Sequence, residues 1–269
     1  MPIPLEDTFS DIIGKALRGL KLSDVDAAAR AGIILPALHS LRGGEWDETN
    51  ARKLAPVLGL GADALAALGN GSTQPAPITV DGLAQFNTQF EDMTVNSYLA
   101  WDTQTREAVA FDTGSDCSDL LALIEKEGLT LRFILLTHTH GDHIFDLDRL
   151  HTRTGAPAYV SDREPIDGAV CFSVGRTFEV GKLRIETRQT WGHSKGGVTF
   201  VIAGLAVPVA VVGDAVFARS MGGGGASYEA ALQTNRDEIL SLPGETVLCP
   251  GHGPLTTVAE EKLHNPFFT

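Results

Sequence analysis

The sequence predicts a layered α/β body preceded by a small all-α domain. Before the linker-like stretch Gly69–Pro77, apolar residues recur at helical spacing and no strand pattern appears. After it, short β-rich runs alternate with turns and helical segments. The stretch itself, G-N-G-S-T-Q-P-A-P, has the composition of a linker. We therefore divide the chain into an all-α domain (1–70), a linker (71–77) and an α/β domain (78–269).

The all-α domain is predicted to begin with a helix whose apolar residues follow an i, i+3/i+4 pattern. These residues are Leu5, Phe9, Ile12, Ile13, Ala16, Leu17 and Leu20. Ser23 is a suitable N-cap for a helix through Ala31, with Gly32 beyond its end. Asp47 can cap a further helix through Leu58, and 63–68 fits a last short helix.

The α/β domain is predicted to contain ten strands and four helices. The strands are 78–86, 97–101, 108–111, 132–136, 158–160, 177–180, 183–190, 198–202, 208–212 and 246–248. The helices are 116–127, 143–154, 228–241 and 256–264. Consecutive strands favour antiparallel pairing, and the interspersed helices are expected to cover the outer faces of the sheets.

The charge and the cysteines limit the class of protein. A net charge of −13 disfavours nucleic acid and anionic membrane as partners. Cys117, Cys171 and Cys249 form no zinc or redox motif, so they are predicted to be small buried thiols in a reducing cytoplasm. The N-terminus lacks the features of a secretory signal, and Gly204 and Pro208 interrupt the longest apolar run. We expect a cytoplasmic protein without a membrane span.

The stretch T-H-T-H-G-D-H, 137–143, follows a predicted buried strand. It supplies His138, His140, Asp142 and His143, and loops at strand ends are where α/β proteins build sites. Imidazole and carboxylate are good ligands for zinc, iron and manganese. Four such groups fit one tetrahedral site poorly and serve two adjacent ions more easily.

Further ligands are expected from three distant loops. His193 in G-H-S, Asp214 in V-G-D-A and His252 in P-G-H-G each stand beside a glycine at the end of an apolar β run. Any one of them alone would be interpreted as a capping or surface residue. Their shared setting predicts that they join the histidine-rich loop.

This ordered set of motifs resembles the metallo-β-lactamase-fold hydrolases over about residues 78–269. The resemblance implies an αββα sandwich, two sheets flanked by helices, with the site at one edge. The segments G-D-A-V-F-A-R-S and L-P-G-E-T-V-L-C-P-G-H-G-P are most similar to the glyoxalase II branch, the hydroxyacylglutathione hydrolases.

The resemblance also implies the ligand sets. His138, His140 and His193 would hold one divalent ion, Asp142, His143 and His252 would hold the other, and Asp214 would bridge them. Zinc is the expected metal, with iron and manganese as alternatives, and Asp142 and Asp214 are the predicted catalytic residues. Asp112 matches a position that supports a ligand histidine, although D-T-G fits an ordinary turn equally well.

The expected chemistry is attack of a metal-bridging hydroxide on a thioester such as a hydroxyacylglutathione. Three alternatives remain open: a lactonase with the same ligands, a persulfide dioxygenase, and a non-enzymatic, metabolite-sensing DNA-binding regulator. The dioxygenase would use one iron held by His138, His193 and Asp214. Lys195, Arg176 and Arg219 are the candidate cations for an anionic small-molecule substrate. The four glycines at 222–225 fit either a flexible lid or a hairpin turn.

Residues 18–68 resemble the helix-turn-helix of phage-repressor-type proteins, with L-S-D-V-D-A-A-A-R-A-G-I followed by L-H-S-L-R-G-G. The helix that would read bases is apolar and contains Pro36, with only His39 and Ser40 as polar groups. Residues 1–70 carry seven basic and nine acidic residues, a net charge of −2. We therefore expect a packing role, as a homodimer contact or as a cover over the rim of the site.

Overall fold

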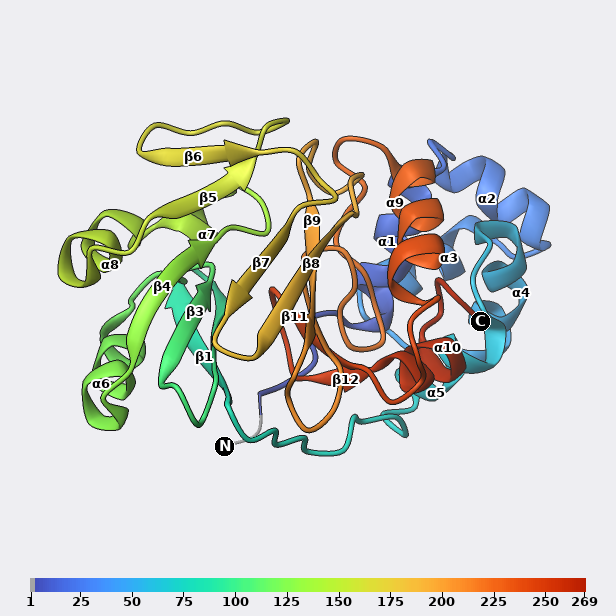
Figure 1. The fold of residues 1–269 in the computed structure, drawn as a ribbon. Coiled ribbons are helices and arrows are strands. Elements are labelled where there is room, and N and C mark those ends of the chain that lie inside the picture. The colour runs from blue at the N-terminus through green and yellow to red at the C-terminus, as the bar shows by residue number, and fades with distance from the viewer. Residues whose placement is uncertain (1–2) are drawn as a thin grey trace.

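The computed structural model describes residues 3–269, beginning with five helices and one 3-10 turn (Figure 1). They are α1 (Phe9–Gly19), α2 (Asp24–Ala31), α3 (Leu35–Arg42), α4 (Glu48–Leu54), the turn Ala55–Leu58 and α5 (Ala62–Gly69). We call residues 3–69 the helical segment. Ser23 and Asp47 cap α2 and α4 as predicted, and Gly32 and Gly59 end α2 and the 3-10 turn in the left-handed conformation.

Two six-stranded sheets form the rest of the molecule. The first, in the order β1-β2-β3-β4-β5-β6, comprises Leu83–Phe90, Met93–Trp101, Glu107–Phe111, Thr130–Leu135, Ala158–Ser161 and Ala169–Phe172. The second, in the order β12-β11-β10-β9-β8-β7, comprises Thr256–Thr257, Val247–Pro250, Val209–Gly213, Val198–Ala203, Leu183–Gln189 and Thr177–Val180. Pairing is antiparallel between most neighbours, and β3 to β6 and the pair β10–β11 are parallel.

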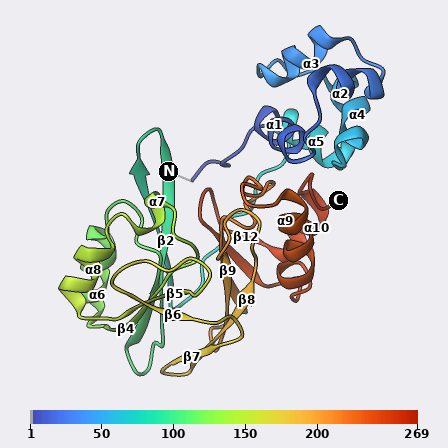
Figure 2. The ribbon, with the colours of Figure 1, turned by 90° about the horizontal axis from the view of Figure 1, so that it is seen from above.

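Helices cover the outer face of each sheet, as predicted. α6 (Ser118–Glu127) and α8 (Leu147–Thr154) pack on the first sheet. α9 (Tyr228–Thr234), its π-helical continuation Asn235–Ile239 and α10 (Val258–His264) lie on the second (Figure 2). Between the sheets lies an apolar core that includes Tyr98, Phe111 and Phe200. This four-layer arrangement is the α/β sandwich expected from the sequence.

Several predicted element boundaries were wrong. The first strand begins at Leu83 rather than at 78, because the chain turns at Gly82. The helix predicted over 143–154 divides into α7 (Gly141–Ile144) and α8 (Leu147–Thr154), because the Asp146 side chain accepts a hydrogen bond from the Cys117 amide. The strand β6 was missed because it is a short edge strand with two of its four residues exposed.

The helical segment packs against the α9–α10 side of the sandwich (Figure 2). Its buried leucines and isoleucines share one cluster with Met221, Ala231 and Phe267 of the α/β body. α3 corresponds to the apolar helix that would read bases in a repressor. It buries Leu38 and Leu41 within the helical segment itself. α1 and α5, not α3, therefore make the contact with the body. No helix among residues 3–269 is long and apolar enough to cross a bilayer.

Candidate metal centre

Seven predicted ligands converge at one edge of the sandwich, because they all follow strands that end there. His138 and His140 follow β4, Asp142 and His143 lie in the short α7, and His193, Asp214 and His252 follow β8, β10 and β11. Their potential ligand atoms form two groups, one of four residues and one of three, in which all atoms lie within 4.8 Å of one another. The distant motifs of the sequence are thus neighbours in space.

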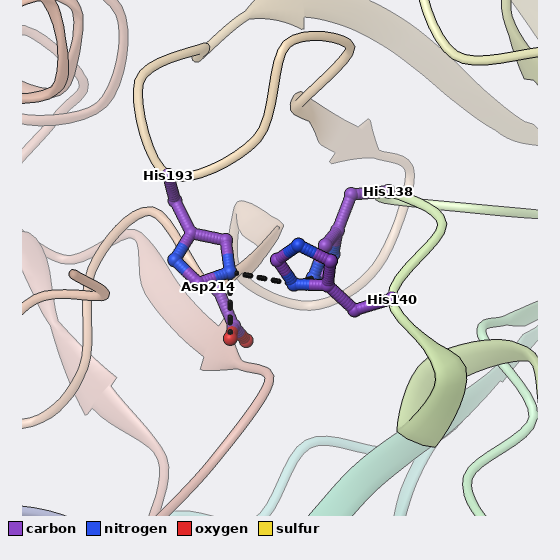
Figure 3. A group of neighbouring side chains, drawn as sticks. All are labelled: His138, His140, His193 and Asp214. Carbon is purple, nitrogen blue, oxygen red and sulfur yellow. Dashed lines mark hydrogen bonds and ion pairs between the residues drawn. The ribbon is translucent and has the colours of Figure 1, made fainter. Parts of the chain in front are cut away.

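The first group comprises His138, His140, His193 and Asp214 (Figure 3). Nδ1 of His140 lies 3.0 Å from Nε2 of His138 and 2.9 Å from Nε2 of His193. A carboxylate oxygen of Asp214 lies 3.3 Å from Nε2 of His193. Three imidazole nitrogens and one carboxylate oxygen at such separations have the composition of a tetrahedral site for zinc or a similar ion.

The second group comprises Asp142, His143 and His252. A carboxylate oxygen of Asp142 lies 3.3 Å from Nε2 of His252 and 3.5 Å from Nε2 of His143. Asp214 also reaches this group, at 3.2 Å from His143 and 3.4 Å from His252. One carboxylate therefore stands between both groups, which is the position of a ligand that two ions share.

The other ring nitrogen of four histidines is already engaged. Nδ1 of His193 donates to the Gly223 carbonyl at 2.9 Å, and Nδ1 of His252 donates to the Thr94 carbonyl at 2.7 Å. Nδ1 of His138 lies 3.1 Å from the Thr137 hydroxyl. A carbonyl can only accept, so in His193 and His252 Nδ1 carries a proton and Nε2 is the ring nitrogen that faces the site.

Asp112 orients the fourth histidine. Its carboxylate is buried and lies 2.9 Å from Nδ1 of His143. It also accepts from the amide and the hydroxyl of Thr137, at 2.8 and 2.7 Å. Asp112 therefore contacts a predicted ligand and is more than a turn residue, the interpretation that the sequence left equally open.

The electrostatics of the two groups differ. Burial lowers the pKa of His138 well below its ordinary value and lowers that of His193. Burial also opposes charge on His143 and His252, but nearby carboxylates, chiefly Asp214, raise their pKa values to about 10 and about 11. Without a metal, the second group is thus a set of paired opposite charges, whereas His138 and His193 of the first group are neutral imidazoles.

The buried polar atoms fit a cation. Nε2 of His143 and Oδ1 of Asp214 are buried and lie 3.2 Å apart, but neither makes a hydrogen bond of good geometry with the other or with any other group among residues 3–269. Such atoms cost free energy unless something else binds them, and a metal ion would bind both. Gly251 keeps this space open, because a Cβ there would lie 2.0 Å from Oδ1 of Asp214 and 2.7 Å from a carbon of His143.

Sequence reasoning missed Asn96, which is buried and positions the His252 loop. Its side-chain amide donates to the carbonyls of Pro250 and Gly253, at 2.9 and 2.8 Å. Asn96 lies in the middle of β2 without a motif around it, so no signal in the sequence distinguished it. The contact depends on the first sheet meeting the second.

The three cations that the sequence offered for an anionic substrate lie elsewhere. Arg219 is 1% exposed and is paired with Glu261, and Arg176 lies over the rings of Tyr159 and Phe178. Lys195 is exposed and does not line the cavity beside the histidines.

That cavity, of about 460 Å³, is instead lined by two cations of the helical segment, Lys15 and Arg18, with His140, His193 and 223–225. Their position depends on how α1 packs, which no local pattern reveals.

The four glycines also differ from expectation. They do not form a hairpin turn, because they lead from the bridge between Phe217 and Ser220 into α9. The backbone after them is fixed by two amides, those of Ala226 and Ser227, which donate to the Gly192 carbonyl. With the bond from His193 to Gly223, this loop lies directly behind a predicted ligand.

The sequence profile of the metallo-beta-lactamase superfamily matches residues 91–252, more than half of the chain. The chain belongs to the metallo-beta-lactamase superfamily. The matched range contains all seven predicted ligands and begins after the helical segment.

Relatives within the superfamily differ in their activities. The chain is 31% identical over 201 residues to a probable metallo-hydrolase of Streptococcus pyogenes serotype M6, covering 64% of this chain and 85% of that one. It is 30% identical over 182 residues to the human mitochondrial persulfide dioxygenase ETHE1, covering 64% and 71%. The crystal structure of TTHA1623 in a di-iron-bound form superposes with a TM-score of 0.56 at 27% identity, covering 68% and 99%.

Proposed function

We propose that this superfamily member is a dinuclear metallohydrolase of the glyoxalase II type that cleaves a thioester. The observation that carries the proposal is the position of Asp214, whose carboxylate oxygens lie within 3.4 Å of His143, His193 and His252 and so reach both groups of ligands. A single-ion site would leave Asp142, His143 and His252 without a role.

The ion assignment follows from the two groups. His138, His140 and His193 would hold the first ion, Asp142, His143 and His252 the second, and Asp214 both. Two such ions, when bound, supply a hydroxide nucleophile near neutral pH and a Lewis acid for the carbonyl oxygen. Zinc is our first choice of metal. Iron is the main alternative, since the TTHA1623 structure is a di-iron form.

The chain's own residues prepare this site for hydrolysis rather than for covalent catalysis. The carbonyls of Gly223 and Thr94 and the carboxylate of Asp112 hold three ligand rings in place. Burial raises the pKa of Cys117 to about 12 and that of Cys249 still further, so both thiols are protonated and poor nucleophiles at neutral pH. Cys171, which the sequence predicted to be buried, is exposed.

The second candidate is a persulfide dioxygenase, which the similarity to human ETHE1 favours. It would use one iron at His138, His193 and Asp214. A lactonase would use the same seven ligands as the thioesterase, so only the substrate distinguishes these two hydrolases.

The test combines metal analysis with a substrate panel. Protein loaded separately with zinc, iron and manganese is analysed for metal per chain and assayed with S-lactoylglutathione, a homoserine lactone and glutathione persulfide. We expect close to two ions per chain, thioester hydrolysis that a chelator abolishes, and no oxygen consumption. One tightly held iron with oxygen uptake on the persulfide would replace this proposal with the dioxygenase. Selective turnover of the lactone would replace it with the lactonase.

A further inference from the structure

The cavity beside His140 and His193 has a second wall that the superfamily profile does not cover. Lys15, Arg18 and Gly19 of α1 face the glycine loop 223–225 across it. The profile begins at residue 91, so this part of the cavity is specific to a chain that carries the helical segment.

The helical segment is fixed where it meets the cavity. Lys15 donates to the Met221 carbonyl at 2.8 Å, and Asp7 accepts from the Ser220 hydroxyl at 2.5 Å. Gly19 lies against the ring of Tyr228 so closely that a Cβ would come within 2.2 Å of it. The helix α1, which carries both cations, is therefore held against the body beside the cavity.

Lys15 and Arg18 differ in whether their charged groups are free to bind a substrate. Lys15 is paired with Asp7, bonded to Met221 and placed over the Phe217 ring, 5.1 Å from its centre. Arg18, three residues further along the same face of α1, forms no ion pair or hydrogen bond with any side chain among residues 3–269 and is exposed. The unpaired guanidinium of Arg18 therefore lines the cavity, whereas the ammonium of Lys15 is already bonded to other groups.

The charges around the cavity make Arg18 the group that would attract an anionic substrate. The chain carries a net charge of −13, which repels an anionic substrate at a distance. Arg18 also lines the adjoining hollow along α1, together with Lys21 and the acidic Glu229. Only Arg18 offers an unpaired positive charge in the same cavity as the histidines, and its planar fork matches a carboxylate with two parallel hydrogen bonds.

We propose that Arg18 binds a carboxylate of the substrate, so that the substrate is a thioester with a carboxylate remote from the reacting carbonyl. This inference rests on the proposed function and names its substrate class. The helical segment, rather than a part of the sandwich, then determines specificity.

The experiment compares Arg18→Ala with Arg30→Ala in the full-length, metal-loaded protein. Arg30 is an exposed residue of α2 that does not line the cavity, so both variants change the net charge equally. For S-lactoylglutathione, we expect Arg18→Ala to raise KM about five- to tenfold, the size typical of a partly exposed charged contact, with kcat and metal content unchanged. Arg30→Ala should behave like the wild type. Arg18→Gln repeats the test if the alanine variant melts at a lower temperature.

A binding measurement makes the result independent of turnover. Calorimetry with S-methylglutathione, a thioether that cannot be hydrolysed, should show the same five- to tenfold loss for Arg18→Ala, and no such loss with its dimethyl ester. Equal binding by wild type and Arg18→Ala, equal losses in both arginine variants, or no binding by the wild type would each overturn the inference. A loss of affinity seen only with acetyl-coenzyme A would also overturn it, because Arg18 would then bind a phosphate and not a carboxylate. If no thioester is hydrolysed but these binding differences appear, the proposed function fails and the carboxylate site stands.

Discussion

At the scale of single residues, the histidines of the two ligand groups differ in their pKa values and in their carboxylate partners. In the first group, burial lowers the pKa values of His138 and His193, and the second group holds histidines paired with Asp142 and Asp214. The Asp214 carboxylate lies near histidines of both groups. Its loss should therefore disturb both ligand sets at once.

Replacing Asp214 by Asn should reduce the bound metal from about two ions per chain to one or fewer, because a neutral amide is a poor bridging ligand. We expect thioester hydrolysis to fall by at least about 100-fold, the upper end of the loss seen when only the support of a ligand is removed. Elemental analysis and steady-state kinetics check this. Asp148→Asn, on the exposed face of α8, is the matched control and should leave both unchanged. Two ions with full activity in Asp214→Asn would contradict the bridging role.

The raised pKa values of His143 and His252 predict how the metal-free protein responds to pH. Since their folded pKa values, about 10 and about 11, exceed the ordinary value near 6.5, their contribution to stability is complete below pH 6.5. It is lost as the pH rises through the folded values. His138 and His193, with lowered pKa values, change stability only below about pH 7.

The free energy of unfolding of the metal-free protein should therefore fall between pH 7 and 9, by at most about 1.4 kcal/mol per pH unit for each histidine. Denaturant unfolding at pH 7, 8 and 9 measures it. In the zinc-loaded protein both rings are neutral ligands, so this decline should be absent. A metal-free protein whose stability is constant over this window would refute the assigned ion pairs.

At the scale of elements, the four strands that precede ligands, β4, β8, β10 and β11, were each predicted to within two residues of their bounds. Apolar runs that end in ligand motifs identify the edge where the site forms. Segments stabilised by distant contacts escaped prediction, because their sequences carry no local pattern. Asn96, the break at Asp146 and the position of Arg18 all depend on partners more than 25 residues away.

The contact between Gly19 and Tyr228 gives a prediction about element packing. Gly19→Val would place side-chain atoms inside the Tyr228 ring, so α1 must shift away from the body. We expect a loss of stability of about 1–3 kcal/mol, typical of overpacking. Ala29→Val, at an exposed position of α2, introduces the same β-branched side chain and should cost less than about 1 kcal/mol. Thermal unfolding of both variants decides, and equal melting temperatures would show that Gly19 is not packed as described.

At the scale of the whole molecule, the helical segment packs on the α/β body through a shared apolar cluster. Its net charge is −2, and its interface with the body buries apolar residues beside Met221, Tyr228 and Phe267. Homodimerisation through these helices stays a prediction.

We predict no detectable DNA binding by the full-length protein at physiological salt, because phosphate contacts require a local excess of basic residues. Selection from a random DNA pool tests this, and an enriched sequence would show that the helical segment is a DNA-binding module. Deleting residues 1–70 should lower solubility, since it exposes the apolar surface around Phe267. The truncated protein should still bind metal through its seven ligands, as measured by elemental analysis.

Two side-chain hydrogen bonds to the backbone of one loop join the helical segment to the site. The Lys15 ammonium donates to the Met221 carbonyl, and two residues further along the Gly223 carbonyl accepts from His193. A loop ordered by one of these contacts is better placed for the other, and such a coupling is reciprocal, with the same free energy in both directions. Occupancy of the first ion site and closure of α1 onto the loop should then be positively cooperative. Residues 3–69 would thereby report on metal occupancy, and their amide-exchange protection should rise as the ions are added.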